Sequence, residues 1–102
     1  GSFFKNPTVK NSNYKFLISK YPDLKGYNTD KGLVKLSAAQ LIERTGFKGR
    51  RAGNVGVSAK HALVLVNYGS GTAKELNDLA ERVKEAVEAK FSVKLEAEVE
   101  NI

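Results

Sequence analysis

The feature that most constrains the fold is an amphipathic stretch that begins at Thr72. Thr72 and Glu75 have the spacing of a capping box, in which a hydroxyl and a carboxylate satisfy backbone amides at a helix N-terminus. Apolar residues then recur at steps of three and four: Leu76, Leu79, Ala80, Val83, Ala86, Val87 and Phe91. This spacing places them in one stripe, so the sequence predicts a long helix with one apolar face.

Two further segments have strand patterns. After the predicted helix, apolar and charged residues alternate, which predicts a half-buried strand with three carboxylates on its polar side: Val93, Leu95, Ala97 and Val99 against Lys94, Glu96, Glu98 and Glu100. Ala62–Val66 is a continuous aliphatic run, which predicts a strand buried on both faces. The apolar start, Ser2–Phe4, predicts an edge strand that ends at the turn signal Asn6-Pro7.

Two shorter helices precede these strands. Residues 13–20 bring apolar side chains close together before Tyr21-Pro22, which predicts a short helix. Ser37 and Gln40 form a second capping-box pattern, so a helix should run through Arg44, with Gly46 suited to its C-terminal end. Residues 23–32, rich in Gly, Asn and Asp, are predicted to form a loop.

The order of elements indicates the fold class. Residues 47–58 contain three glycines and a basic cluster, and we expect a poorly defined strand there rather than a helix. The whole order is then roughly β-α-α-β-β-α-β. This order predicts a small α+β fold, one domain over residues 1–102, with a mostly antiparallel sheet packed by helices on one side.

Composition excludes several classes of protein. The 102 residues include no Cys and a single His, which excludes a disulfide framework, a thiolate metal site and a site with several histidine ligands. No apolar run is long enough to cross a bilayer, and no signal-peptide pattern opens the chain. We therefore expect a cytoplasmic chain with no membrane partner and no metal.

The chain also lacks Met and Trp and begins with Gly1-Ser2. A natural intracellular protein starts with Met, so we expect a trimmed or redesigned domain. Cleavage of an affinity tag would leave the same two residues, and Ser2 would then be a remnant of that tag.

Positive charge is concentrated in the first part of the chain. Residues 1–61 contain twelve Lys and Arg against three Asp and Glu, a net charge of +9, and residues 62–102 contain five against eight, a net charge of −3. Aromatic side chains, Tyr14 and Tyr27 among them, are interleaved with the basic ones. Such a block suits phosphate-bearing partners through charge and stacking. The ordinary interpretation is that the lysines solvate a surface and the aromatics fill the core.

Three features of the sequence are candidate sites of chemistry. Residues 49–56, beside Lys48, combine glycines with two arginines and suit an approaching anion, but their spacing fits neither the Walker nor the dinucleotide fingerprint. His61 stands at the mouth of the predicted aliphatic strand, where a hydrogen-bonded structural role is the usual one. The row Glu96, Glu98 and Glu100 places like charges on one face, which can raise a pKa, although such a row is usually a solvated strand face.

A series of sequence blocks resembles a known family. The blocks are Gly1–Pro7 (GSFFKNP), Tyr21-Pro22 with Tyr27, Val34–Ala39 with Leu41-Ile42, Gly46–Gly49, Val57–Ala62, Lys90-Phe91 and Leu95–Val99. In this order, over nearly the whole chain, they resemble the C-terminal domain of the UDP-N-acetylenolpyruvoylglucosamine reductase (MurB) family of peptidoglycan synthesis. The tyrosine-bearing loop resembles the subclass with the longer substrate loop.

The resemblance implies a division of labour. In the family, an N-terminal domain holds FAD and accepts hydride from NADPH, and the C-terminal domain closes the substrate against it. No FAD or NADPH site is implied in this chain, because the flavin domain is missing from it. By the matching of motifs, Ser2 takes the position of the serine proton donor and Glu98 that of the catalytic glutamate. Positions that meet the UDP-N-acetylglucosamine-type substrate fall on Asn6, Tyr27, Lys35, Lys48 and His61.

The chain departs from the family pattern at several positions. Gly53-Asn54-Val55 stands where Gly-Gly-Ala is common, and Ala97 stands where Pro is usual. Glu100 stands where Arg is frequent, which places an anion near a site for anions and is expected to weaken substrate binding.

We therefore predict an isolated substrate-binding domain of a flavin-dependent reductase, without catalysis on its own and with weak affinity for UDP-N-acetylglucosamine derivatives. Two alternatives remain open. A small basic nucleic-acid-binding module is suggested by the +9 block and by residues 48–51, although no RNP, KH or helix-turn-helix signature supports it. An engineered or excised scaffold without activity is suggested by the missing Met, Cys and Trp.

Overall fold

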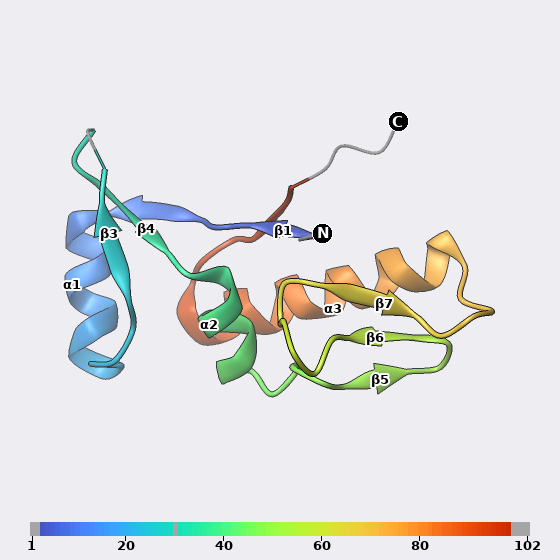
Figure 1. The fold of residues 1–102 in the computed structure, drawn as a ribbon. Helices are drawn as coiled ribbons and strands as arrows, with labels where there is room; N and C mark the ends of the chain where they lie inside the picture. The colour runs from blue at the N-terminus through green and yellow to red at the C-terminus, as the bar shows by residue number, and fades with distance from the viewer. Residues whose placement is uncertain (1–2, 30, 99–102) are drawn as a thin grey trace.

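The computed structural model describes residues 3–29 and 31–98 and shows helices and short strands in an α+β arrangement (Figure 1). The helices are α1 (Asn11–Lys20), α2 (Ala38–Arg44) and α3 (Ala73–Phe91). The strands are β1 (Phe4–Lys5), β2 (Thr8–Lys10), β3 (Gly26–Asn28), β4 (Leu33–Leu36), β5 (Arg51–Ala52), β6 (Val55–Val57), β7 (Leu65–Asn67) and β8 (Glu96–Ala97). The predicted fold class is confirmed.

Strand pairing is antiparallel throughout the described ranges. The strands there form three small sheets, β1–β8, β2–β4–β3 and β5–β6–β7, where the sequence suggested one. Figure 1 shows the β2–β4–β3 sheet with α1 at one end of the molecule and the β5–β6–β7 sheet with α3 at the other. Helix α2 lies between these two parts.

Helix α3 is the element that the sequence predicted most fully. The Thr72 hydroxyl accepts a hydrogen bond from the Glu75 amide at 3.1 Å, and the Thr72 amide donates to Glu75 Oε1 at 3.2 Å, so the capping box is complete. Its apolar stripe is buried against β6 and α2 and contains Leu79, Ala80, Val83, Val87 and Phe91. The helix ends at Ser92, which is left-handed with φ 57°.

Helix α2 is short, and its apolar face is fully buried in the core. Ala38, Leu41 and Ile42 have no exposed surface. The Ser37 hydroxyl accepts from the Gln40 amide at 3.2 Å, as predicted. The Gln40 side chain, however, does not complete the capping box: it bonds to the segment before β3. Gly46, with φ 84°, follows the end of the helix, as its sequence position indicated.

Helix α1 packs on one face of the β2–β4–β3 sheet. Leu17 is buried, and the Tyr14 hydroxyl donates to the Leu24 carbonyl at 3.1 Å. The Tyr14 ring lies so close to β3 that a Cβ added at Gly26 would sit 2.6 Å from it, which explains the glycine. Phe16, by contrast, is 61% exposed.

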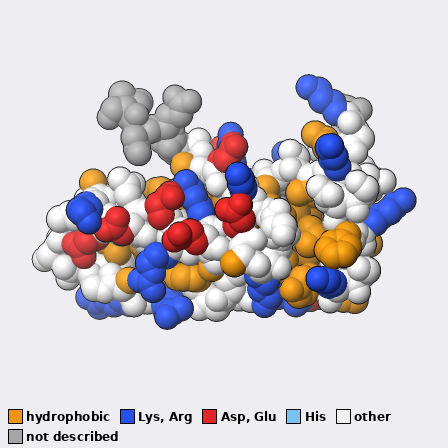
Figure 2. All heavy atoms as spheres, turned by 180° about the vertical axis from the view of Figure 1, so that it is seen from behind, with side chains coloured by type: hydrophobic (Ala, Val, Ile, Leu, Met, Phe, Trp, Pro, Cys, Tyr) orange, Lys and Arg blue, Asp and Glu red, His pale blue; other side chains and the backbone are white. Residues whose placement is uncertain are grey.

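The two halves differ on their surfaces as well. Figure 2 shows acidic side chains, with basic ones among them, over the half that contains α3. On the half that contains α1, hydrophobic side chains lie exposed beside Lys and Arg side chains. Lys20 Nζ there lies 4.9 Å from the centre of the Phe16 ring. The acidic side chains of α3 therefore lie on one half, whereas the basic block of residues 1–61 extends over both, since its β5 and β6 lie beside α3.

Two strand predictions were wrong. Residues 23–32 contain β3, which pairs with β4. The strand was missed because Tyr27 and Asn28 are exposed and Gly26 lacks a side chain, so no apolar alternation marks it. The run Ala62–Val66 is not a doubly buried strand, since Leu63, Val64, Leu65 and Val66 are half-buried. Its strand, β7, lies at the edge of its sheet, and the buried central strand is the glycine-containing β6.

The glycine-rich region forms the β5–β6 hairpin. Ala52 pairs with Val55, so Gly53 and Asn54 form the two-residue loop, with Gly53 at φ 63°. Gly56 lies in the buried strand β6, where an added Cβ would stand 2.9 Å from the Arg50 carbonyl oxygen. The "poorly defined strand" of the sequence is therefore a tight hairpin.

The alternation at the chain's end is confirmed over residues 93–98. Val93 and Leu95 are buried, whereas Lys94, Glu96 and Glu98 are exposed. Only Glu96 and Ala97 of this described stretch form a ladder, pairing with Lys5 and Phe4. Ser2, Val99 and Glu100 lie outside the described residues. Among the described helices, none has the length and apolar character needed to cross a membrane.

The capping box of α3 generates a stability prediction. Thr72→Ala removes the acceptor for the Glu75 amide, so we expect the free energy of unfolding to fall by about 1 kcal/mol, measured by urea unfolding with circular dichroism. Ser70→Ala, two residues earlier in the exposed loop, is the matched control and should change it by less than about 0.5 kcal/mol. Equal effects of the two substitutions would contradict this role of the cap.

Candidate functional site

Two of the predicted substrate residues are neighbours on one sheet face. In the β2–β4–β3 sheet, Lys35 is directly opposite Thr8 on one side and Tyr27 on the other. Directly opposed residues share a face, with Cβ atoms about 5 Å apart. All three side chains are exposed, while Val34 and Leu36, which alternate with Lys35, are buried. The structure therefore forms a Thr8–Lys35–Tyr27 row on the outer face of the sheet.

The row combines an aromatic ring with a positive charge. Tyr27 is 62% exposed, which core packing does not explain, because Tyr14 covers the opposite side of β3. An exposed ring offers a stacking surface, and an ammonium group beside it offers an anion contact. Thr8 adds a hydroxyl that no sequence motif marks, because its position opposite Lys35 depends on the register of β2 with β4.

Lys48 and His61 line a second part of the surface. They contribute to a hollow of about 380 Å³, which is also lined by Ala39, Glu43, Lys60, Ala62, Leu63 and Val64. Lys48 Nζ lies 2.7 Å from Glu43 Oε1, so one of the cations in this hollow already has a carboxylate partner. The backbone amides of Lys60 and His61 both donate to the Ser58 hydroxyl, at 3.1 and 3.2 Å, which shapes the turn that presents His61.

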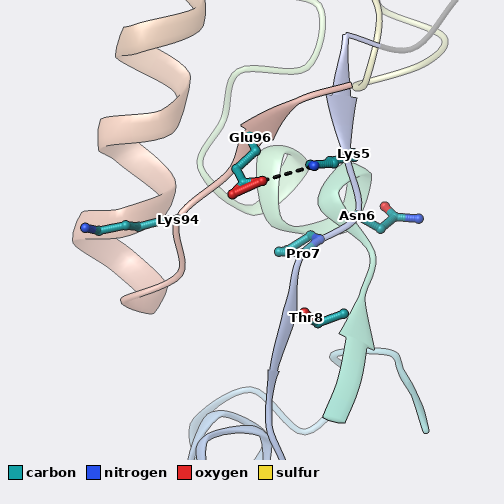
Figure 3. Close-up of a pocket in the computed structure, with 6 residues that line it drawn as sticks. All are labelled: Lys5, Asn6, Pro7, Thr8, Lys94 and Glu96. Carbon is teal, nitrogen blue, oxygen red and sulfur yellow. Dashed lines mark ion pairs between the residues drawn. The ribbon is translucent and has the colours of Figure 1, made fainter. Parts of the chain in front are cut away.

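Asn6 lines a second hollow, of about 260 Å³, with Lys5, Pro7, Thr8, Lys94 and Glu96 (Figure 3). Lys5 Nζ and Glu96 Oε1 are 3.1 Å apart across this hollow and join β1 to β8. Asn6 Oδ1 accepts a hydrogen bond from the Ala38 amide at 2.9 Å, at the N-terminus of α2. Asn6 therefore holds β1 to α2 as well as facing solvent.

Glu98 is connected to the Lys48–His61 hollow through Phe3. The Glu98 amide donates to the Phe3 carbonyl at 2.7 Å, and the Phe3 amide donates to the Leu63 carbonyl at 2.7 Å. Leu63 lines the hollow that contains His61, and the Glu98 side chain is exposed. Ser2, the predicted proton donor, lies outside the described residues, so its role stays a prediction.

The arginines of the β5–β6 hairpin are used for stacking. The Arg51 guanidinium lies 4.0 Å from the centre of the Tyr68 ring, and Arg51 Nε donates to the Gly53 carbonyl at 2.8 Å. Arg50 lies 5.1 Å from the centre of the Phe47 ring. These contacts favour the interpretation of a basic surface loop over that of an anion cradle.

The carboxylate row does not form a cluster in the described residues. Glu96 pairs with Lys5, and Glu100 lies outside the described ranges. Within those ranges, no three His, Asp or Glu side chains gather in a way that would hold a metal ion.

The fold and these surfaces define a small α+β domain with an exposed aromatic and basic row and a separate hollow that carries lysine and histidine. Residues 1–102 match the family model described as UDP-N-acetylenolpyruvoylglucosamine reductase, C-terminal domain. The chain belongs to this family.

Similar proteins bear the same family name. The chain is 49% identical over 98 residues to a UDP-N-acetylenolpyruvoylglucosamine reductase of Polynucleobacter asymbioticus, covering 96% of this chain and 28% of the relative. For the Pseudomonas aeruginosa reductase the identity is 49% over 98 residues, covering 96% and 29%, and for that of Flavobacterium johnsoniae 44% over 99 residues, covering 97% and 29%. The chain thus spans less than a third of the length of these curated relatives.

The bond from Asn6 to α2 generates a second prediction. Asn6→Ala leaves the Ala38 amide without its acceptor, so we expect the free energy of unfolding to fall by about 1 kcal/mol in urea unfolding. Asn6→Asp retains an acceptor at the same position and places a negative charge at a helix N-terminus, so its stability should stay close to that of the unsubstituted chain. An Asn6→Ala chain as stable as the Asn6→Asp chain would contradict the structural role.

Proposed function

We propose that the chain is the substrate-binding domain of a flavin-dependent UDP-N-acetylenolpyruvoylglucosamine reductase and that it binds the UDP-N-acetylglucosamine portion of the substrate. The observation that carries the proposal is the exposed Tyr27 beside Lys35, in a chain that matches this family along its whole length. The proposal covers one domain, residues 1–102.

The chemistry of the row and of the hollow suggests which part of the ligand each would bind. The Tyr27 ring suits the flat face of a nucleobase, and the Lys35 ammonium suits a phosphate oxygen. Lys48 would also meet the UDP portion, Asn6 would donate to it from its amide nitrogen, and His61 would line the substrate pocket. Because Lys48 is paired with Glu43, a ligand anion at Lys48 has to compete with that carboxylate.

Two features of the described residues argue against a flavin site. Cofactor pyrophosphates are commonly held at helix N-termini that follow a glycine-rich turn. The N-termini of α2 and α3 are capped by Ser37 with Asn6 and by Thr72 with Glu75, and α1, which has no side-chain cap, follows β2 directly without a glycine turn. The glycines of residues 49–56 lie in a hairpin rather than between a strand and a helix. We propose that FAD and NADPH belong to the remaining part of the full-length relatives.

Two residues are proposed for the chemistry itself. Ser2 would donate a proton to a substrate carbon that develops negative charge, since its neutral hydroxyl can release a proton as that charge grows. Glu98 would be the catalytic glutamate next to Ser2. This is consistent with the hydrogen bond from its amide to the carbonyl of Phe3, the residue after Ser2. Without the rest of the reductase, we expect no reductase activity from this chain.

The proposal is tested by titrating the ¹⁵N-labelled chain with UDP-N-acetylglucosamine and following the amide shifts. We expect saturable shifts at Tyr27, Lys35, Lys48 and His61. Tyr27→Ala should weaken binding about tenfold, because base stacking on an aromatic ring contributes roughly 1–3 kcal/mol. Tyr68→Ala, which removes an exposed tyrosine that follows β7, is the matched control and should leave the affinity unchanged.

The other candidate functions make different predictions in the same experiment. A nucleic-acid-binding module would bind a short single-stranded RNA with an affinity that falls steeply with added salt, and would not respond to the nucleotide sugar. An inert scaffold would respond to neither ligand. Either result would contradict the proposed function.

A further inference from the structure

The segment that leads from α1 into β3 is fastened to α2 by one side-chain amide. This segment, Tyr21–Lys25, lies outside helix and strand, and its Leu24 is buried. Gln40 Nε2 donates to the Asp23 carbonyl at 2.8 Å, and Gln40 Oε1 accepts from the Lys25 amide at 2.8 Å. Both ends of the Gln40 amide are therefore bonded to the backbone of the same short segment.

A second side chain of α2 holds the same segment. Arg44, one helical turn after Gln40, forms an ion pair with the Asp23 carboxylate. Residues four apart lie on the same face of a helix, so Gln40 and Arg44 act together on the segment. The Arg44 carbonyl also accepts a hydrogen bond from Lys90 Nζ at 2.9 Å, which links this end of α2 to α3.

The segment leads directly into β3. Lys25 directly precedes Gly26–Asn28, so the bond at the Lys25 amide lies two residues from Tyr27. The β4 side of the same sheet continues from Leu36 into Ser37 at the start of α2. The sheet that carries the Thr8–Lys35–Tyr27 row is thus attached to α2 through both β3 and β4.

The same helix also builds the other half of the candidate site. Ala39 and Glu43 line the hollow that contains Lys48 and His61. Gln40 and Arg44 are the residues that follow them, so adjacent faces of one buried helix serve the hollow and the segment. Any change in how the segment sits on α2 would move the Tyr27 side of the site relative to the hollow.

We propose that Gln40 and Arg44 are positioning residues, which fix the Thr8–Lys35–Tyr27 row relative to the Lys48–His61 hollow. Their effect on binding rests on the proposed function, since a ligand that meets both surfaces binds best when both are already in place. Their effect on the position of the row relative to the hollow does not depend on the proposed function.

The geometric part is tested without ligand by residual dipolar couplings of the 102-residue chain. With wild-type Gln40 and Arg44, one alignment tensor should fit the amides of α3 and of the β2–β4–β3 sheet. In Gln40→Ala and in Arg44→Met, the sheet couplings should become smaller while those of α3 are unchanged. Asn77→Ala and Lys74→Met, which remove an exposed amide and an exposed ion pair on α3, are matched controls and should keep one tensor. One tensor in both α2 variants would overturn the inference.

The binding part uses UDP-N-acetylglucosamine as the probe. Gln40→Ala should weaken binding about three- to tenfold, the range that loss of a hydrogen-bonded contact produces. The ligand-induced shifts at Tyr27 and Lys35 should shrink more than those at Lys48 and His61. Arg44→Lys, which retains the charge, should recover the affinity that Arg44→Met loses, and uniform loss at all four positions would contradict a positioning role. If the unsubstituted chain does not bind, the proposed function fails, while the dipolar couplings still decide the geometry.

Discussion

The burial of α2 is the constraint on which the rest of the structure depends. A helix of seven residues is too short to be stable alone, and α2 is stabilised by the complete burial of Ala38, Leu41 and Ile42. Once that side is in the core, the remaining side chains of α2 face other parts of the chain: Ala39 and Glu43 line a hollow, and Gln40 and Arg44 hold the segment before β3. The helix therefore joins the two ends of an extended molecule.

The helices were predictable because their signals are local. Thr72 and Glu75 are three residues apart, and the apolar stripe of α3 needs only its own spacing to be recognised. The strands β3 and β7 were not predictable in the same way. Tyr27 is exposed because its strand borders solvent, and Leu65 and Val66 are half-buried because β7 pairs on one side within the described sheet. Both facts depend on tertiary neighbours that short-range patterns do not reveal.

In the candidate site, too, the residues could be predicted from sequence motifs, but their arrangement in space could not. Tyr27 and Lys35 were each picked out through the family resemblance, but their pairing follows from the register of β3 with β4, which the turn between them sets. That turn is closed by the Thr29 amide, which donates to the Leu33 carbonyl at 2.8 Å. The sequence places Gln40 in a capping box, yet in the fold its side chain bonds the backbone of Asp23 and Lys25, which lie more than ten residues earlier in the chain.

Asn6 has a consequence for the kind of group that the site can select. Its Oδ1 atom is already bonded to the backbone of α2, and Figure 3 shows its amide turned away from Lys5 and Pro7. That bond uses one of the two lone pairs of Oδ1, so donation from the two N–H groups of Nδ2 becomes the larger share of what Asn6 could offer a bound molecule. At this position a phosphate or carbonyl oxygen is favoured over an ammonium group. The bond that holds Asn6 to α2 thus also biases the polarity that Asn6 would present to a bound molecule.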